Sequence, residues 1–195
     1  GTSFYPFRKK PEFFPTFVHK LEMVIQDLTL SQKLEDDSDC NVINDDCRTS
    51  SKFIKKNSID LVFTSPPYPN DMEYTRQTRL DLFLLEYVKN LDDVQKIKKK
   101  MVRGSTKLIF NDSDSSELVK DNKQIQKIAN EIAKKLDGKN WGWDYPKMVR
   151  EYFGDMHLCL EDFKKILKND GKVILVVGNQ TSKGVFIPVI DILKD

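Results

Sequence analysis

The sequence is poor in glycine and cysteine and has no long apolar run. Its 195 residues include eight glycines and three cysteines, Cys40, Cys47 and Cys159. Three cysteines without zinc-ligand spacing argue against a disulfide framework and a zinc site, and they favour a reducing, cytoplasmic compartment. No apolar stretch approaches the roughly 18–20 residues of a membrane span, and no signal peptide opens the sequence. These absences predict a soluble intracellular domain, which can be a piece of a longer protein.

Net charge is also small, because 32 Lys and Arg balance 30 Asp and Glu to give +2. The net charge therefore predicts no strong electrostatic attraction of the whole protein to nucleic acid or to a membrane surface. The one basic block, residues 95–107, has six bases and no acid: Lys96, Lys98, Lys99, Lys100, Arg103 and Lys107. Such a block is more often a solvated helix face than a binding surface, but it can neutralise phosphates if an anionic polymer lies nearby.

Hydrophobic residues make up 39% of the sequence, which suits one globular domain with a sizeable core. The apolar spacing predicts helices and strands in alternation, and hence an α/β domain with a mainly parallel sheet. Helices are expected over residues 15–32, 73–89, 91–102, 119–136 and 152–167. Strands are expected over residues 40–43, 59–63 and 172–177. The last two strands are continuous apolar runs, which predicts that both faces of the sheet are covered.

The most informative segment follows the strand at residues 59–63 and reads Thr64-Ser65-Pro66-Pro67-Tyr68. Two consecutive prolines remove two N–H donors and stiffen the chain. Backbone carbonyls and the Ser65 side chain are thereby left at the carboxyl end of a strand, where open α/β sheets bind ligands. The ring of Tyr68 can stack on a planar ligand there. The alternative is an ordinary proline-stiffened turn with a core tyrosine.

The string Ser65-Pro66-Pro67-Tyr68 resembles motif IV of the S-adenosylmethionine-dependent DNA amino-methyltransferases. Residues 44–48 resemble the strand-to-acidic-turn element of that family, and residues 69–76 continue the motif as in many members. Residues 167–179 resemble the family's helix, turn and next strand. The resemblance implies a partial Rossmann-like methyltransferase sheet within a single domain, residues 1–195, that carries a mainly helical insert at residues 81–149.

The resemblance also implies DNA methylation, as in restriction–modification systems, on cytosine N4 or adenine N6. Ser65 and the Pro66 carbonyl would accept the two amino hydrogens, Pro67 would stiffen the turn, and Tyr68 would stack on an extruded base. Asp45, Asp46 and Thr64 are the expected contacts to S-adenosylmethionine. The expected DNA contacts are Asn70, Arg76, Arg79, Lys98, Lys99, Lys100 and Arg103.

Two further features leave alternatives open. Arg76 and Arg79, three apart on one face of the helix predicted over residues 73–89, can hold phosphate or form ion pairs with neighbouring acids. Trp141, Trp143 and Tyr145 can form a base-stacking surface, although aromatic packing that fixes a long insert is the commoner outcome.

One expected feature is missing. The family binds its cofactor chiefly through a glycine-rich turn, and this sequence contains no Gly-x-Gly. The sequence is then a fragment, or a missing cofactor-binding half or partner subunit completes it, or its cofactor site is degenerate. Such a piece is expected to associate, for example as a homodimer, through its unfinished sheet. Two rival functions stay open: a non-catalytic nucleic-acid-binding module, and an amino-methyltransferase that acts on RNA or protein.

Overall fold

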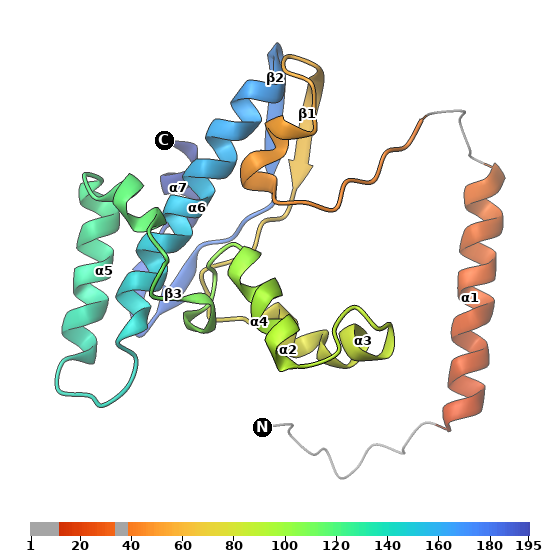
Figure 1. Ribbon diagram of the computed structural model, residues 1–195, viewed down its shortest axis with the longest axis horizontal. Helices are drawn as coiled ribbons and strands as arrows, with labels where there is room; N and C mark the ends of the chain where they lie inside the picture. Colours follow the sequence, from red (N-terminus) through yellow and green to blue (C-terminus); the bar gives the residue numbers. More distant parts are fainter. Residues whose placement is uncertain (1–11, 34–38) are drawn as a thin grey trace. The chain divides into compact units, whose positions relative to one another are not determined.

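The computed structural model describes residues 12–33 and 39–195 and divides the chain into two compact units, residues 1–42 and 43–195. The first unit contains α1, Phe13–Lys33, which confirms the helix expected over residues 15–32 (Figure 1). None of the residues of α1 is buried. Its apolar face, which includes Phe17, Leu21 and Leu28, is therefore exposed.

Two parallel strands form the larger sheet of the second unit: β1, Ile59–Thr64, and β2, Leu167–Leu175. The parallel pairing confirms the prediction for these two segments. Val62 pairs with Val173 and Phe63 with Ile174. Residues 167–179 were expected to contain a turn before the strand, but residues 168–171 lie inside β2, where the register of the pairing shifts. A second, antiparallel sheet of β3, Gln180–Ser182, and β4, Val185–Ile187, was not predicted.

The strand predicted over residues 40–43 is wrong. These residues are irregular and exposed, and Val42 is 87% exposed. The apolar side chains of this short segment therefore do not pack in a sheet. The ladder hydrogen bonds of β1 are made with β2 instead, at a segment more than 100 residues further along the chain.

The single helix predicted over residues 73–89 is also wrong. It is divided into α2, Tyr74–Gln77, and α3, Arg79–Leu84. Between them, Thr78 has a ψ of 10°, and its hydroxyl donates to the Tyr74 carbonyl at 3.0 Å. A Thr side chain that bonds the preceding turn competes with regular helical pairing, which explains the break.

The remaining elements are helical and are distributed along the whole second unit. They are η1, Cys47–Lys52; α4, Leu91–Lys100; η2, Thr106–Leu108; η3, Ser115–Val119; α5, Lys123–Leu136; α6, Asp144–Ile166; and α7, Val189–Lys194. The helix α6 begins eight residues before the predicted one. Within residues 12–33 and 39–195, no helix is both long and apolar enough to cross a membrane.

The core is built around α6, which runs beside the β1–β2 sheet and α5 (Figure 1). Residues of the predicted insert, such as Val102, Ile128 and Ile132, belong to the same buried cluster as Tyr152 and Ile166 of α6. Residues 81–149 are thus packed into the domain core. The mixed helix–strand architecture with small sheets is compatible with the predicted α/β class.

Within the second unit, residues 43–195 cover only one face of the β1–β2 sheet. Val62 and Val173 pack against the core. On the opposite face, Leu61 is 49%, Phe63 67% and Ile174 44% exposed. Within residues 43–195, the prediction that both faces are covered is wrong.

Candidate active site

The carboxyl end of β1 leads directly into the Ser-Pro-Pro-Tyr segment. Pairing continues one step beyond β2, because the Val176 amide donates to the Thr64 carbonyl at 2.9 Å. The Val176 carbonyl accepts hydrogen bonds from Ser65 Oγ at 3.1 Å and from Tyr68 Oη at 3.2 Å. Since a serine has one hydroxyl proton, this bond leaves the lone pairs of Ser65 Oγ available to accept. The turn therefore holds Ser65 as an acceptor and fixes Tyr68 through its hydroxyl.

Gly104 lets a second segment approach the back of this turn. A Cβ at Gly104 would lie 2.6 Å from the Tyr68 carbonyl oxygen and 3.5 Å from Pro67 Cβ. Any side chain there would push the two segments apart. The prolines between Ser65 and Tyr68 are half-buried, whereas Ser65 itself is exposed. One side of the turn is thus supported by protein, and the serine faces solvent.

Asp71 anchors the chain that leaves the turn. Its φ is 65°, and its amide donates to the Gly104 carbonyl at 3.0 Å. Its carboxylate accepts from the Thr106 amide and hydroxyl, from the Ser105 hydroxyl and, at 2.6 Å, from the Tyr145 hydroxyl. Burial alone would raise the pKa of Asp71, but these hydrogen bonds outweigh it and hold the pKa below its usual value. Burial and the neighbouring carboxylate raise the pKa of Tyr145 to about 12.

Sequence reasoning missed the supporting roles of Gly104, Asp71 and Tyr145. The glycine was detectable in principle, because a glycine in a glycine-poor sequence often marks a close backbone approach. The Asp71–Tyr145 hydrogen bond joins residues 74 positions apart, and no local pattern reveals such a contact.

The acidic turn before η1 contains both predicted cofactor aspartates. Asp46 caps η1 by accepting from the Arg48 amide at 2.9 Å, and it also accepts from the Arg48 guanidinium. Burial alone would raise the pKa of Asp46, but the bonds from Arg48 outweigh it and lower the pKa. Asp45 is exposed, and its carboxylate accepts from the Asp46 amide at 2.7 Å. Asp46 is therefore engaged in the fold, while Asp45 keeps free oxygens.

An open groove of about 370 Å³ lies between this turn, β1 and α6. Its lining includes Asp45, Asp46, Cys47, Phe53, Leu61 and Ile166. The structure thus brings the two predicted aspartates together over mainly apolar walls. Thr64, the third predicted cofactor residue, is not part of this lining.

A buried charge network lies behind the acidic turn. Asp155 of α6 is fully buried and accepts from Arg48 Nη1 at 2.9 Å, from Arg103 Nη1 at 2.7 Å and from Ser115 Oγ at 2.7 Å. Gly154 makes this contact possible, because a Cβ there would lie 2.0 Å from the Ser115 carbonyl oxygen. Sequence reasoning missed Asp155, although an acid among the apolar positions of a helix is a detectable sign of a buried ion pair.

The structure separates the residues of the basic block. Lys98 is buried and pairs with Glu73 at 2.9 Å, and Arg103 pairs with Asp155. Lys99 is exposed and pairs with Asp112 at 3.3 Å, and Lys100 is exposed. Two of the predicted phosphate contacts, Lys98 and Arg103, are therefore used inside the protein.

The predicted DNA contacts nearest the turn are Asn70 and Arg76. Both line an open hollow of about 560 Å³ together with Asp71, Gln77 and Lys107. Arg79 lies in α3, beyond the break at Thr78, so the prediction that it shares one helix face with Arg76 is wrong. Arg79 is exposed.

The aromatic cluster contains both tryptophans, and lysines lie over its rings. Trp141 is 47% and Trp143 73% exposed. The Lys183 ammonium lies 5.0 Å from the Trp141 ring centre and 3.9 Å from that of Tyr145. Exposed indoles beside cations form a surface that unstacked bases and phosphates can contact. Across the described part of the chain, no three His, Cys, Asp or Glu side chains are grouped to hold a metal ion.

Comparison with known proteins gives a distant similarity. The chain is 26% identical over 164 residues to the Type II methyltransferase M.AvaI of Nostoc sp. (strain PCC 7120) and, to the same extent, to that of Anabaena variabilis. The match covers 81% of this chain and 34% of each relative, so the chain spans about a third of the length of these proteins. No protein-family model and no solved structure matches the chain. The matched relatives are methyltransferases, which agrees with the resemblance carried by the Ser-Pro-Pro-Tyr turn.

Proposed function

We propose that this chain is the target-base part of a DNA amino-methyltransferase, which transfers a methyl group to cytosine N4 or adenine N6. The observation that carries the proposal is the turn at the end of β1, where Ser65 and Tyr68 both donate to the Val176 carbonyl. The similarity to Type II methyltransferases supports the same reaction class.

The chemistry needs hydrogen-bond acceptors at this position. The exocyclic amino group of a nucleobase is a weak nucleophile, because its lone pair is delocalised into the ring. Two acceptors aimed at its hydrogens draw the nitrogen towards tetrahedral geometry and free the lone pair. Ser65 Oγ and the Pro66 carbonyl are the acceptors in this proposal. Since the serine proton is held by Val176, Ser65 presents lone pairs to the base.

Tyr68 would hold the base in this position. Its hydroxyl is bonded to Val176, and its backbone rests against Gly104, so the ring is restrained before a base arrives. A restrained ring loses little entropy when a base stacks on it, and much of the catalysis would then be positioning. A base inside a duplex cannot reach the turn, so it must be flipped out of the helix.

S-adenosylmethionine supplies an electrophilic methyl group when bound. The groove beside β1 has two carboxylates for hydroxyl or amino groups and apolar walls for an adenine ring, so it fits part of this cofactor. The sequence has no Gly-x-Gly turn for close backbone approach to the remainder. We therefore propose that Asp45 and Asp46 contribute to a shared site, and that a further part of the protein or a partner subunit completes it.

DNA contacts are proposed on the two sides of the turn. Asn70 and Arg76 line the hollow that follows it, and Arg79, Lys99 and Lys100 are exposed. Lys98 and Arg103 are left out of the proposed phosphate contacts, because their partners are Glu73 and Asp155.

The missing glycine-rich turn favours one rival function, a nucleic-acid-binding module without catalysis. Replacing Tyr68 in the complete enzyme tests the proposal. Tyr68→Ala should lower methyl transfer to a duplex about 5- to 150-fold, because one base–aromatic stack contributes about 1–3 kcal/mol. Affinity for S-adenosylmethionine should be nearly unchanged.

Tyr68→Phe is the matched control, because it keeps the ring and removes only the hydroxyl bond to Val176. It should retain most of the activity. Nucleoside mass spectrometry of the product then identifies the methylated base, for which N4-methylcytosine is the first expectation. Wild-type turnover by Tyr68→Ala would exclude the stacking role, and an inactive complete enzyme would favour the binding module.

A further inference from the structure

Two cysteines that are far apart in sequence lie against one another in the second unit. Cys47 is the first residue of η1, and Cys159 belongs to α6, 112 positions later. Their Sγ atoms are 3.5 Å apart. A disulfide has an S–S distance of about 2.05 Å, so a side-chain movement of less than about 2 Å would join them.

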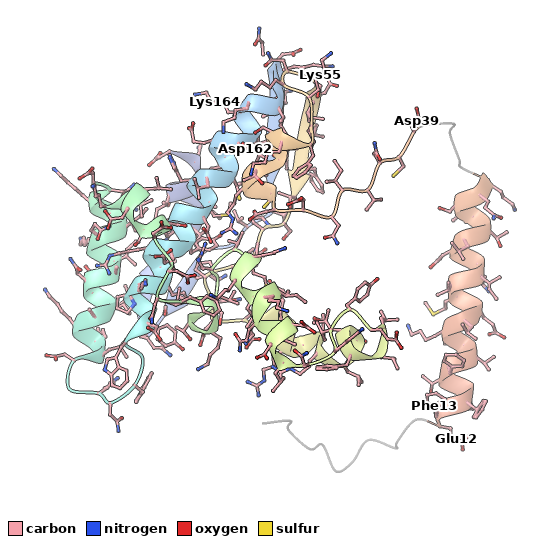
Figure 2. The ribbon with its side chains drawn as sticks, viewed as in Figure 1. Glu12, Phe13, Asp39, Lys55, Asp162 and Lys164 are labelled. Atoms are coloured by element: carbon pink, nitrogen blue, oxygen red, sulfur yellow. The ribbon has the colours of Figure 1, made fainter. Side chains whose placement is uncertain are left out.

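The protein holds the two elements in this position by contacts that do not involve sulfur. Asp162 of α6, labelled in Figure 2, lies beside η1 and accepts from the Ser50 hydroxyl and from the Ser51 amide and hydroxyl, all at 2.7–2.8 Å. Arg48 adds a link from η1 to Asp155 of the same helix. The thiol pair is therefore preformed.

The two thiols differ in access to solvent. Cys47 is exposed and lines the groove, whereas Cys159 is 3% exposed. A small oxidant dissolved in water thus reaches Cys47 first. Cys159 can react only with a group that Cys47 brings to it.

The surroundings favour a thiolate at the exposed position. The hydrogen bond from Cys159 and the charge of Arg48 lower the pKa of Cys47 to about 7, against the opposing effects of burial and of Asp46. The bond to Cys47 and burial raise the pKa of Cys159, which therefore stays protonated and donates its S–H. A partly ionised exposed thiol beside a buried protonated thiol is the arrangement of an attacking and a resolving cysteine.

We propose that Cys47 and Cys159 are a peroxide-reactive modification site that closes to a disulfide. The Cys47 thiolate attacks one oxygen of hydrogen peroxide, the O–O bond breaks, and the departing hydroxide takes a proton to become water. This leaves Cys47 as a sulfenic acid. The Cys159 sulfur then attacks the Cys47 sulfur, the S–O bond breaks, and the departing hydroxide takes the Cys159 proton. In sum, two thiols give two electrons to one peroxide, and one disulfide and two waters form.

The inference needs no assumption about methyl transfer. It does place the modification in the wall of the groove, at Cys47, which lines the groove together with Asp45 and Asp46. Closure would fix the start of η1 covalently to α6 at the point where the acidic turn ends.

The experiment uses the full chain with Cys40→Ser, which removes the remaining thiol, an exposed one outside the pair. One equivalent of hydrogen peroxide at pH 7 should remove both free thiols and lower the mass by two hydrogens. Peptide mapping without reductant should recover the Cys47–Cys159 link, and dithiothreitol should reverse it. Two free thiols left after treatment, or overoxidised Cys47 without the link, would overturn the proposal. This measurement changes no core residue, so it cannot fail through misfolding.

Two matched variants in the same background separate the roles. Cys159→Ala should stop at the sulfenic acid, which gains one oxygen and is trapped by a 1,3-dicarbonyl reagent. Cys47→Ser should consume peroxide at least tenfold more slowly than the parent. Equal rates for the two variants would show that Cys47 is not the attacking thiol and would overturn the assignment.

Discussion

The two faces of the β1–β2 sheet have almost the same composition and opposite surroundings. Val62 and Val173 pack against the core around α6, whereas their neighbours Phe63 and Ile174 are 67% and 44% exposed. A strand alternates its side chains between two faces, so an apolar run on both faces is typical of a sheet covered on both sides. The difference shows that residues 43–195 supply a covering layer for one face of the sheet and leave the other face exposed.

The largest effect is expected from a charge on the covered face. Val173→Asp should destabilise the protein by at least about 2 kcal/mol, because a carboxylate would replace an apolar side chain that packs against the core. Ile174→Asp is the control, one residue away on the exposed face. At a protein concentration low enough for the chain to be monomeric, it should change stability by less than about 0.5 kcal/mol. Urea unfolding followed by circular dichroism measures both. Equal losses in the two monomeric variants would mean that Ile174 is covered within the monomer, which would contradict the comparison.

The next effect concerns the contacts that hold η1 against α6 beside the covered face. Asp162→Asn should lower stability by about 1.5–3 kcal/mol at pH 7, because Asp162 accepts several hydrogen bonds through a buried carboxylate. Burial alone would raise the pKa of Asp162, but the bonds from Ser51, Lys165 and Ser50 outweigh it and lower the pKa. A lowered pKa in the folded state means that the stabilisation is present above the usual value of 3.8 and is lost as pH falls below it.

Unfolding measured between pH 7 and pH 3 checks this sign. The stability difference between the wild type and Asp162→Asn should shrink as the solution becomes more acidic. Lys165→Met is a milder control, since it removes one exposed partner of Asp162 and leaves the serines in place. A difference that stays constant with pH would contradict the role of the charged carboxylate.

The parts of the fold that the sequence predicted are those with a local signal. The apolar runs of β1 and β2 and the helical spacing of α1, α4 and α5 depend on neighbouring residues, and all five elements formed. The position of the turn after β1 followed from the same logic, because the prolines end the strand. The helix over residues 73–89 failed because a single threonine side chain competes with the backbone, which propensity does not resolve.

The supports of the candidate site could not be predicted, because they join segments far apart in the chain. Asp71 with Tyr145, Arg48 with Asp155, and Cys47 with Cys159 are separated by 74, 107 and 112 positions. The sequence therefore indicated the residues of the candidate turn more readily than the residues that hold this turn in place. Lys98 and Arg103 show the same limit. Their positive charges suggested phosphate binding, but in the structure they pair with acids from other parts of the sequence.

A smaller effect is expected behind the turn, where Tyr145 donates to Asp71. Tyr145→Phe should cost about 0.5–1.5 kcal/mol at neutral pH, because one hydrogen bond is lost and the ring is kept. The pKa of Tyr145 is raised from 10.0 to about 12, so its stabilisation is fully present below pH 10 and is lost as pH rises towards 12. As pH rises from 10 to 12, the wild type should therefore lose the extra stability that it has over Tyr145→Phe at neutral pH. The Tyr145→Phe variant, which has no hydroxyl at this position, should not show this loss. An identical alkaline profile in both proteins would contradict the contact.

The smallest effect on stability is expected from a substitution on the exposed face of the β1–β2 sheet. This substitution also tests most directly how the exposed face differs from the covered one. At a protein concentration low enough for the chain to be monomeric, Phe63→Ser should change the unfolding free energy by less than about 0.5 kcal/mol, because the ring is 67% exposed in this unit. We expect the chain to associate through this face, since Leu61, Phe63, Ile174 and Val176 form a contiguous apolar surface on paired strands. Light scattering should find a dimer or larger species for the wild type and a smaller species for Phe63→Ser. Leu118→Ser, which removes a 48% exposed leucine from η3, is the control and should leave the oligomeric state unchanged. A wild-type monomer that binds S-adenosylmethionine at micromolar concentration would refute the interpretation that the sheet and the cofactor site are incomplete in this chain. Such a monomer would contain a complete cofactor site despite the exposed face of its sheet.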